Sequence, residues 1–389
     1  MTAAAPAALA FGPHTAEEVV AALVDDVRGR PGEGERLLAL LPERHPLYEG
    51  RGANAVMRLR GYLLAAFEQT GLPEGALPYV LEELESGREA YTVAAAARAV
   101  RGMPAPTPGV VPYLVRAVEN IRFSDDTVTF AAYRPSWPTA GGTTALAEIF
   151  ETLGWLGAHA APALPALESM TGPRATEFTS ESRARIARAI ERIRGAGTPA
   201  PCCCAPAPRV GLTRRAPGPA ARPGAIAGIR VEDQDGEALP FGTFFTGKPA
   251  VLAFFYTRCT NPDKCSATIT RLARLQERRA EEGLAGRIRV AAITYDPEYD
   301  LPARLRAYGG SRGFRFGPDD RLLRSRDGFP ILREHFQLGV GFTGTTVNRH
   351  RIELFILDAR GEVAVTFERL QWQVEDVLDR ARELLPARG

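Results

Sequence analysis

Cysteine is scarce in this sequence, and it has neither long apolar runs nor a large net charge of either sign. Five cysteines in 389 residues are too few for a fold stapled together by disulfides. No stretch reaches the roughly 20 predominantly apolar residues that a transmembrane helix needs. With 48 Lys and Arg against 46 Asp and Glu, the formal charge of +2 gives no electrostatic reason to expect nucleic acid or a membrane as partner.

The N-terminus also lacks the features of a secretory signal. Residues 1–11 are rich in alanine, contain Pro6, and carry no Lys or Arg ahead of their apolar part, whereas a signal peptide begins with basic residues. We therefore expect residues 1–35 to be a partly disordered leader. We also expect a cytoplasmic protein.

Residues 36–194 lack runs of β-branched residues and repeat their apolar residues at helical spacing. Three segments are alike, because each pairs an apolar helix with a second helix that opens on a proline: Pro78, Pro112 or Pro165. The pattern resembles HEAT-type helical repeats, with an insertion around residues 121–142. It predicts an all-α, HEAT-like solenoid that binds another protein on its concave surface, and a generic helical bundle is the alternative.

All five cysteines fall between residues 202 and 265. Cys202, Cys203 and Cys204 are adjacent, and they lie in a Pro- and Gly-rich stretch, residues 195–224, that its composition predicts to be an extended linker. Such a cluster arises by chance, or it is a mobile arm that exchanges metal or disulfides with a neighbouring site.

The other two cysteines, Cys259 and Cys265, follow an apolar run at 250–255 that predicts a buried strand. In residues 225–389 strands alternate with helices, and the expected elements after the cysteines are a basic amphipathic helix at 266–282, a strand at 287–294, a helix opened by Asp300 and Pro302, a hairpin over 351–367 and a closing helix at 374–385. This order is typical of a thioredoxin-like α/β fold. A thiol pair at the exit of a buried strand is a disulfide clasp, a redox couple, a metal site or a coincidence.

Five separated motifs occur in order along the same residues: Asp233-Gln-Asp-Gly236, Gly247-Lys-Pro249, Phe255-Tyr-Thr-Arg-Cys259, Thr294-Tyr-Asp-Pro-Glu-Tyr-Asp-Leu-Pro302 and Asn348-Arg-His-Arg351. Together they resemble the SCO1/SenC family of thioredoxin-fold, copper-handling proteins that assist cytochrome oxidase assembly. The resemblance implies that Cys259, Cys265 and His350 bind copper as Cu(I). Cu(I) is soft and favours thiolates, and an imidazole completes a site of low coordination number.

The sequence departs from the family pattern in the cysteine loop. Five residues, Thr260 to Lys264, separate the cysteines, where the family has three. We expect the turn-forming Asn261-Pro262-Asp263 to bring the sulfurs together. We also expect Arg258 and Lys264, each beside a cysteine, to lower the thiol pKa values.

Three functions remain open from the sequence. The first is delivery or sensing of Cu(I), with the helical half selecting the partner protein. The second is a thiol-disulfide oxidoreductase in which Cys259 attacks and Cys265 resolves, and the third is a non-enzymatic interaction scaffold. Thioredoxin-like oxidoreductases place a cis-proline opposite their cysteines, but no proline occurs between Ile331 and Leu385.

The absence of a proline at this place favours a metal-binding or redox protein over a turnover enzyme. A peroxidase would need a Pro-x-x-x-Thr-x-x-Cys context, which residues 254–259 lack. We expect Asp296 and Asp300 to fix a turn and cap the following helix.

Overall fold

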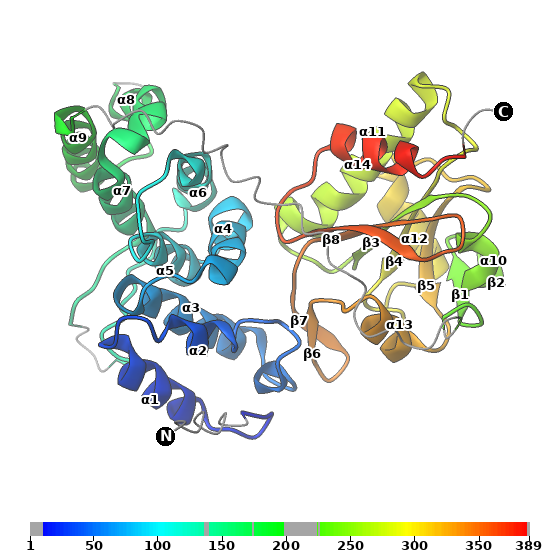
Figure 1. The fold of residues 1–389 in the computed structure, drawn as a ribbon, viewed down its shortest axis with the longest axis horizontal. Coiled ribbons are helices and arrows are strands. Elements are labelled where there is room, and N and C mark those ends of the chain that lie inside the picture. Colours follow the sequence, from blue (N-terminus) through cyan, green and yellow to red (C-terminus); the bar gives the residue numbers. More distant parts are fainter. Residues whose placement is uncertain (1–10, 136–139, 173–174, 198–223, 225, 387–389) are drawn as a thin grey trace, which may run out of the picture. The chain divides into compact units, whose positions relative to one another are not determined.

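The computed structural model describes residues 11–135, 140–172, 175–197, 224 and 226–386. These residues divide into two compact units (Figure 1): helices α1 to α9 form one, and the strands with helices α10 to α14 form the other, residues 341–344 excepted. The predicted leader residues 1–10 and the linker cysteines Cys202, Cys203 and Cys204 lie outside the described residues. Within them, no helix is both long and apolar enough to cross a lipid bilayer.

The first unit consists of helices, and its longest connection, residues 122–144 between α6 and α7, falls where the sequence predicts an insertion. Their bounds are α1 Glu17–Arg28, α2 Gly34–Leu38, α3 Ala53–Thr70, α4 Leu77–Ser86, α5 Ala90–Val100, α6 Val111–Ile121, α7 Ala145–Leu156, α8 Leu164–Thr171 and α9 Ser180–Gly195. The predicted prolines lie in the first turns of α4, α6 and α8, where a missing N–H leaves no hydrogen bond unmade. The predicted pairs of helices, each with a proline at the start of its second member, are therefore confirmed.

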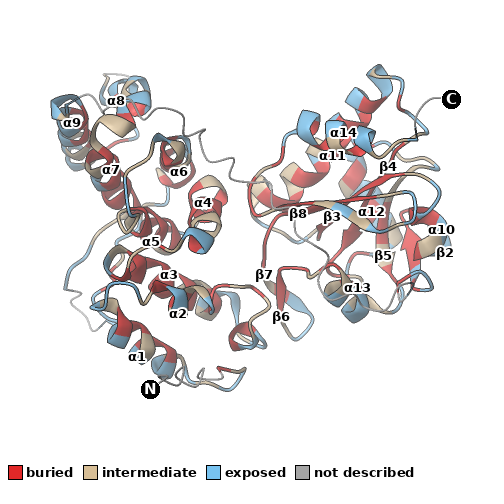
Figure 2. Cartoon of the chain, in the orientation of Figure 1, coloured by how far each residue is buried: buried red, intermediate tan, exposed pale blue. Residues whose placement is uncertain are grey.

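Helices α3, α5, α7 and α9 pack one on the next, and α4 packs on α6. Figure 2 shows α3 and α5 mostly in the colour of buried residues. In α5 this burial extends over an alanine run, Ala94 to Ala97, whose small side chains allow helices to approach from several sides. The core of this unit thus lies between successive helices rather than under a sheet.

The helical unit begins earlier in the chain than we predicted. Helix α1 lies within the stretch expected to be a leader, and it packs on α3 through the buried Val20, Val24 and Val27. These three valines recur at intervals of four and three residues, which is the spacing of an amphipathic helix. The helical region therefore starts at Glu17 and not at residue 36.

The second unit is built on a seven-stranded sheet with the order β2-β1-β5-β4-β3-β8-β9, and β6 and β7 form a separate hairpin. The strands are β1 Arg230–Asp233, β2 Ala238–Pro240, β3 Ala250–Phe255, β4 Arg289–Thr294, β5 Asp320–Ser325, β6 Val340–Thr343, β7 Thr346–His350, β8 Glu353–Leu357 and β9 Val363–Glu368. The helices are α10 Phe241–Phe245, α11 Ala267–Glu281, α12 Pro302–Gly310, α13 Phe329–His335 and α14 Val374–Glu383. Strands β3, β4 and β5 run parallel, and β8 and β9 continue the sheet antiparallel.

Strand β3 is central and is buried along its whole length. Val251, Ala253 and Phe255 belong to the core that α11 and α14 complete on one face of the sheet. Phe254 points to the other face, where its ring contacts those of Phe336 and Phe355. The β3-α11-β4 unit followed by the β8-β9 hairpin and α14 makes this a thioredoxin-like α/β domain, as the sequence predicts.

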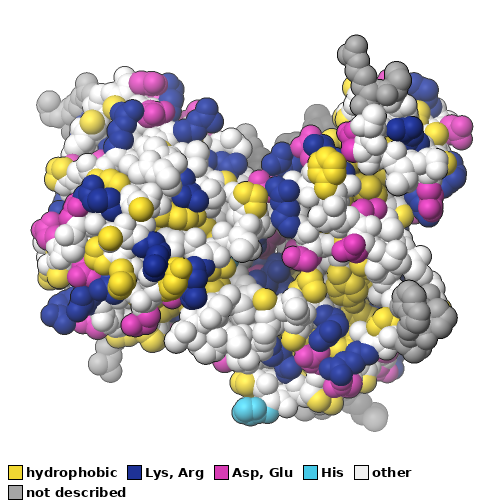
Figure 3. Space-filling model, turned by 180° about the vertical axis from the view of Figure 1, so that it is seen from behind, with side chains coloured by type: hydrophobic (Ala, Val, Ile, Leu, Met, Phe, Trp, Pro, Cys, Tyr) yellow, Lys and Arg dark blue, Asp and Glu magenta, His cyan; other side chains and the backbone are white. Residues whose placement is uncertain are grey.

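The surface carries charges of both signs. On the face drawn in Figure 3, Lys and Arg side chains are interspersed with Asp and Glu side chains. This agrees with the formal charge of +2 over the whole chain.

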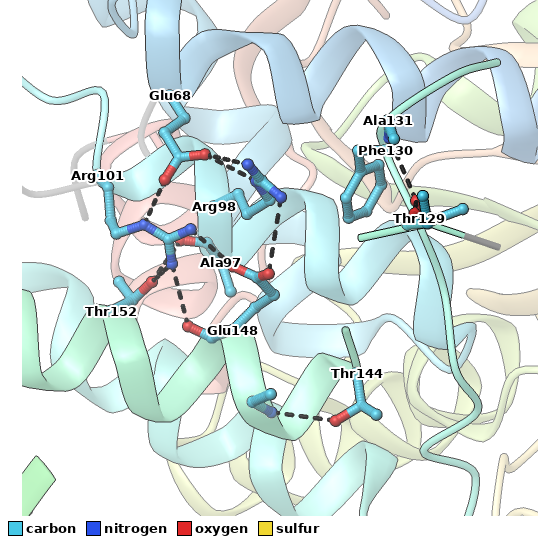
Figure 4. A network of polar contacts seen from close by, with 12 residues as sticks. Glu68, Ala97, Arg98, Arg101, Thr129, Phe130, Ala131, Thr144, Glu148 and Thr152 are labelled. Atoms are coloured by element: carbon cyan, nitrogen blue, oxygen red, sulfur yellow. Dashed lines mark hydrogen bonds and ion pairs between the residues drawn. The ribbon is translucent and has the colours of Figure 1, made fainter. Parts of the chain in front are cut away.

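A network of charged side chains links three helices of the first unit (Figure 4). Arg101, which directly follows α5, donates to Glu68 of α3 over 2.7 Å and to Glu148 of α7 over 2.6 Å, and it also donates to Thr152 over 2.9 Å. Arg98 pairs with the same two carboxylates. Burial would raise the pKa of Glu68, but the hydrogen bonds and charges of the two arginines outweigh it and lower that pKa. The network thus fixes the register of α3, α5 and α7.

Candidate metal centre

The three predicted ligands come together at the ends of separate elements. Cys259 lies in the turn after β3, Cys265 lies in a π-helical turn at Pro262–Ser266 just before α11, and His350 is the last residue of β7. His350 Nε2 is 3.4 Å from Cys259 Sγ and 3.6 Å from Cys265 Sγ. The ligand atoms all lie within 4.8 Å of one another, and both cysteines are free thiols.

The lengthened cysteine loop closes as expected. The Asn261 side chain accepts a hydrogen bond of 2.9 Å from the amide of Asp263, which starts the turn. The following π-helical turn widens the backbone ring and thereby takes up extra residues before α11 begins. The Gln371 side chain, which follows β9, donates to the carbonyl of Asp263 and holds the turn from outside.

The ring of His350 is oriented by its surroundings. Its Nδ1 is 3.0 Å from the carbonyl oxygen of Arg351, and because a carbonyl only accepts, Nδ1 carries the proton. Nε2 is the ring nitrogen that faces the two sulfurs, which is the arrangement of a metal-ligating histidine with an outer partner. The rings of Tyr256 and Tyr295 pack on His350 at centroid distances of 5.3 Å and 5.6 Å.

The two thiols have opposite acidities. A hydrogen bond from Cys265, helped by the adjacent His350, lowers the pKa of Cys259 to about 3, although partial burial opposes this shift. Full burial and the neighbouring Cys259 raise the pKa of Cys265 well above its usual value. At neutral pH the pair is therefore one thiolate, Cys259, and one thiol that donates to it.

The basic neighbours of the cysteines act differently from our expectation. Arg258 donates to Asp296 over 3.0 Å and lies over the ring of Tyr299 at 4.2 Å, so its charge is matched by a carboxylate. The leading causes of the lowered pKa of Cys259 are Cys265 and His350, so the prediction that Arg258 lowers a thiol pKa is not confirmed. Lys264 does act on Cys265 in the expected direction, but burial outweighs it.

Asp300 also has a different partner from the one predicted. Helix α12 begins after Leu301 without a side-chain cap, so the predicted cap by Asp300 is wrong. Asp300 instead accepts hydrogen bonds from the amide of Thr257, over 3.0 Å, and from the hydroxyl of Thr294, over 2.5 Å. Strands β3 and β4 both end here, and Asp300 satisfies polar groups that the sheet no longer pairs.

A buried polar group next to the site was missed by the sequence analysis. The hydroxyl of Tyr295 donates to Glu353 over 3.1 Å, and the amide of Gly339 donates to the same oxygen over 2.8 Å. Burial raises the pKa of Glu353 to about 7, although Arg351 opposes the shift. The sequence did contain a sign of this buried group, because Arg351 and Glu353 are charged residues in an otherwise apolar strand sequence.

The donor set fits a soft metal ion. Two sulfurs and an imidazole nitrogen suit Cu(I), whereas hard cations such as Ca²⁺ and Mg²⁺ take oxygen ligands. The ring of His350 is held in orientation through Nδ1, and the lowered pKa of Cys259 favours its thiolate, the form that binds a soft cation.

Comparison with known families agrees with this geometry. The SCO1/SenC family model matches residues 230–385. These residues form a SCO1/SenC domain. The match covers the sheet from β1 onward and contains all three candidate ligands, while the helical unit lies outside it. No curated protein matches the chain.

Several solved structures are similar to the SCO1/SenC domain. A SCO1/SenC family lipoprotein from Bacillus anthracis str. Ames is 23% identical, with 40% of this chain and 91% of that chain covered and a TM-score of 0.35. Copper-bound ScoI from Bradyrhizobium japonicum is 22% identical, with 41% and 100% covered and a TM-score of 0.32. Copper-bound yeast Sco1 is 19% identical, with 41% and 89% covered and a TM-score of 0.32.

Proposed function

We propose that the SCO1/SenC domain binds Cu(I) through Cys259, Cys265 and His350, and that it delivers this ion to a partner protein or senses it. The observation that carries the proposal is the convergence of two sulfurs on Nε2 of a histidine whose other nitrogen is held by a carbonyl. Such a site is selective, because its donors are soft and its histidine cannot turn away.

The protonation of the pair suits this cargo. The Cys259 thiolate is ready to accept a cation, and the ion would take the place of the proton that Cys265 donates. Cys265 and His350 are buried, with 1% and 6% of their surfaces exposed, whereas Cys259 is partly exposed. The ion would therefore enter past Cys259 and be held away from water.

The test is a Cu(I) titration of the full chain in competition with a chromophoric chelator. We would first replace Cys202, Cys203 and Cys204 with serine, so that the linker thiols contribute no binding. In that background Cys259→Ser, Cys265→Ser and His350→Ala should each weaken Cu(I) binding by more than the roughly 10- to 100-fold that loss of an outer partner costs.

The control is His335→Ala. His335 is a half-buried histidine at the end of α13 outside the site, so its loss should leave the affinity unchanged. Tight binding that survives in all three site variants would remove the copper proposal.

A second candidate function is thiol-disulfide exchange, and the lowered pKa of Cys259 is the observation that favours it. The Cys259 thiolate would attack a substrate disulfide and release one substrate thiolate. Cys265, after losing its proton, would attack the sulfur of Cys259, close a disulfide and release the second substrate thiol. A redox titration against a dithiol buffer, read by mass spectrometry, tests this; a pair that stays reduced at every cytosolic potential contradicts it.

For the helical unit we propose HEAT-like repeats that bind the partner protein. The proposal is supported by the three helix pairs that open on proline and by the succession of α3, α5, α7 and α9. If the domain were only a scaffold, capture of a partner by this unit would survive loss of Cys259 and Cys265. The cytoplasmic location expected from the sequence also stays a prediction.

A further inference from the structure

This chain uses lysine at only two positions, Lys248 and Lys264, and arginine everywhere else that a permanent cation occurs. Lys264 is one of the extra residues of the lengthened cysteine loop, and only 9% of it is exposed. A buried ammonium group is costly unless hydrogen bonds compensate for the lost water. The buried ammonium group of Lys264, directly before Cys265, therefore needs a hydrogen-bond acceptor nearby.

The partner lies on the segment that carries the third ligand. Lys264 Nζ donates over 2.9 Å to the backbone carbonyl of His350, a residue 86 positions further along the chain. The imidazole of the same histidine is held through Nδ1 by the next carbonyl, that of Arg351. The first contact fixes where the backbone of His350 lies relative to the cysteine turn, and the second fixes how its ring is rotated.

The loop needs such a contact because it is long. Five residues between the cysteines allow more conformations than three, and each would set a different distance from the sulfurs to Nε2. Gln371 holds one side of the turn through the carbonyl of Asp263, and Lys264 holds the other side to β7. The turn is thus fastened to both segments that flank it.

We infer that Lys264 is a positioning residue, which clamps the cysteine turn to the histidine segment and so sets the three donors before the metal arrives. The inference rests on the copper-binding function proposed above. Its consequence is that the contribution of His350 to metal affinity depends on Lys264, because a histidine on an unclamped segment loses freedom each time the ion binds. Two residues that act through one contact give non-additive effects when both are changed.

The experiment is a double-mutant cycle on the full chain in the background lacking the linker cysteines. Lys264→Met keeps the apolar stem and removes the donor, and it should weaken Cu(I) binding by about 10- to 100-fold, as loss of an outer partner does. Adding His350→Ala to Lys264→Met should then cost much less than His350→Ala costs alone. X-ray absorption of the Cu(I)-loaded Lys264→Met chain should show two sulfur ligands with reduced imidazole scattering.

The other lysine supplies a matched control. Lys248 also donates to a backbone carbonyl, that of Gly286, over 2.8 Å, but it precedes β3 at the end of the strand opposite the cysteines. Lys248→Met should leave the affinity and the absorption spectrum unchanged. If Lys264→Met does not fold, Lys264→Gln keeps a polar group that is one bond too short to reach His350, and it should give the same loss of coupling.

The outcomes separate the clamp from the copper site itself. Unchanged affinity in Lys264→Met, or a His350→Ala effect of undiminished size in that background, overturns the clamp and leaves the copper function standing. If the chain with both native lysines has no tight Cu(I) site, the clamp and the proposed copper function are both overturned. Equal losses in Lys264→Met and Lys248→Met would also overturn the clamp, since they would indicate a general effect on folding.

Discussion

At the level of single residues, the two cysteines differ because one is fully buried and the other is not. Cys265 donates to Cys259, and this contact stabilises a thiolate on the more accessible sulfur. Thiolates are the nucleophilic form, so reactivity should be concentrated on Cys259.

We predict that iodoacetamide modifies Cys259 at a rate that changes little between about pH 5 and about pH 8, because the pKa of Cys259 lies well below this range. Cys265 should stay unmodified in the folded chain, because its pKa is raised and its side chain is buried. Mass spectrometry of the alkylated peptides measures both. The linker cysteines, replaced by serine, cannot interfere.

Cys265→Ala is the informative variant, since it removes the hydrogen bond that contributes most to the shift. The pKa of Cys259 should rise, and its alkylation at low pH should slow by about tenfold for each unit by which the pKa exceeds the pH. An unchanged rate in this variant would mean that Cys265 is not the cause of the acidity.

Sequence reasoning reached the ligands but not the residues that set their properties. His350 was found through the Asn348-Arg-His-Arg351 motif, and the turn through the local chemistry of Asn261. The partner of Lys264 could not be found in this way, because it lies 86 positions away and is decided by how β7 packs beside the cysteine turn. For the same reason Arg258 was assigned to the thiols rather than to Asp296.

At the level of elements, short windows of sequence were sufficient to predict those strands and helix starts that depend only on neighbouring residues. The buried strand β3 and the prolines that open α4, α6 and α8 were predicted from short windows of sequence. Contacts between helices were not predictable, because residues on α3, α5 and α7 meet only after those helices have packed.

Arg101 tests one such contact. We predict that Arg101→Met destabilises the helical unit by about 1.5 to 3 kcal/mol, because Glu68 and Glu148 each lose a charge-assisted hydrogen bond, while Arg98 still pairs with both. Because the chain has two compact units, which can unfold separately, the effect has to be measured on the helical unit itself. Hydrogen exchange of peptides from α5 and α7 is therefore the measurement.

Arg116→Met is the control for this variant. Arg116 forms an exposed pair with Glu119 on α6, and such pairs contribute about 0 to 1 kcal/mol. Equal loss of protection in the two variants would show that the network has no special role in holding α3, α5 and α7 together.

At the level of the whole molecule, the chain joins a helical unit to a SCO1/SenC domain through a stretch that contains three adjacent thiols. The three thiols, Cys202, Cys203 and Cys204, lie outside the described residues. The change from helical spacing to alternating strands and helices predicts a division of the chain near residue 225, which stays a prediction.

We predict that replacing Cys202, Cys203 and Cys204 with serine lowers the number of Cu(I) ions bound per chain or slows exchange of the ion at the Cys259 site, because free thiols on a tether can act as ligands for a soft ion. Metal analysis of the loaded chain and stopped-flow transfer to a chelator measure the two effects. The same stoichiometry and rate in both chains would assign the cluster to chance.

If the centre binds Cu(I) as proposed, the unequal exposure of its three ligands gives metal exchange a direction. Cys259 is partly exposed, whereas Cys265 and His350 lie beneath it in the domain. An incoming acceptor would meet the Cys259 bond first and the bonds of the two buried ligands after it, so an ion would be passed on by stepwise substitution rather than by escape into water. The affinity of the centre and its rate of release are then separable quantities, the first set by all three donors and the second by access to one sulfur.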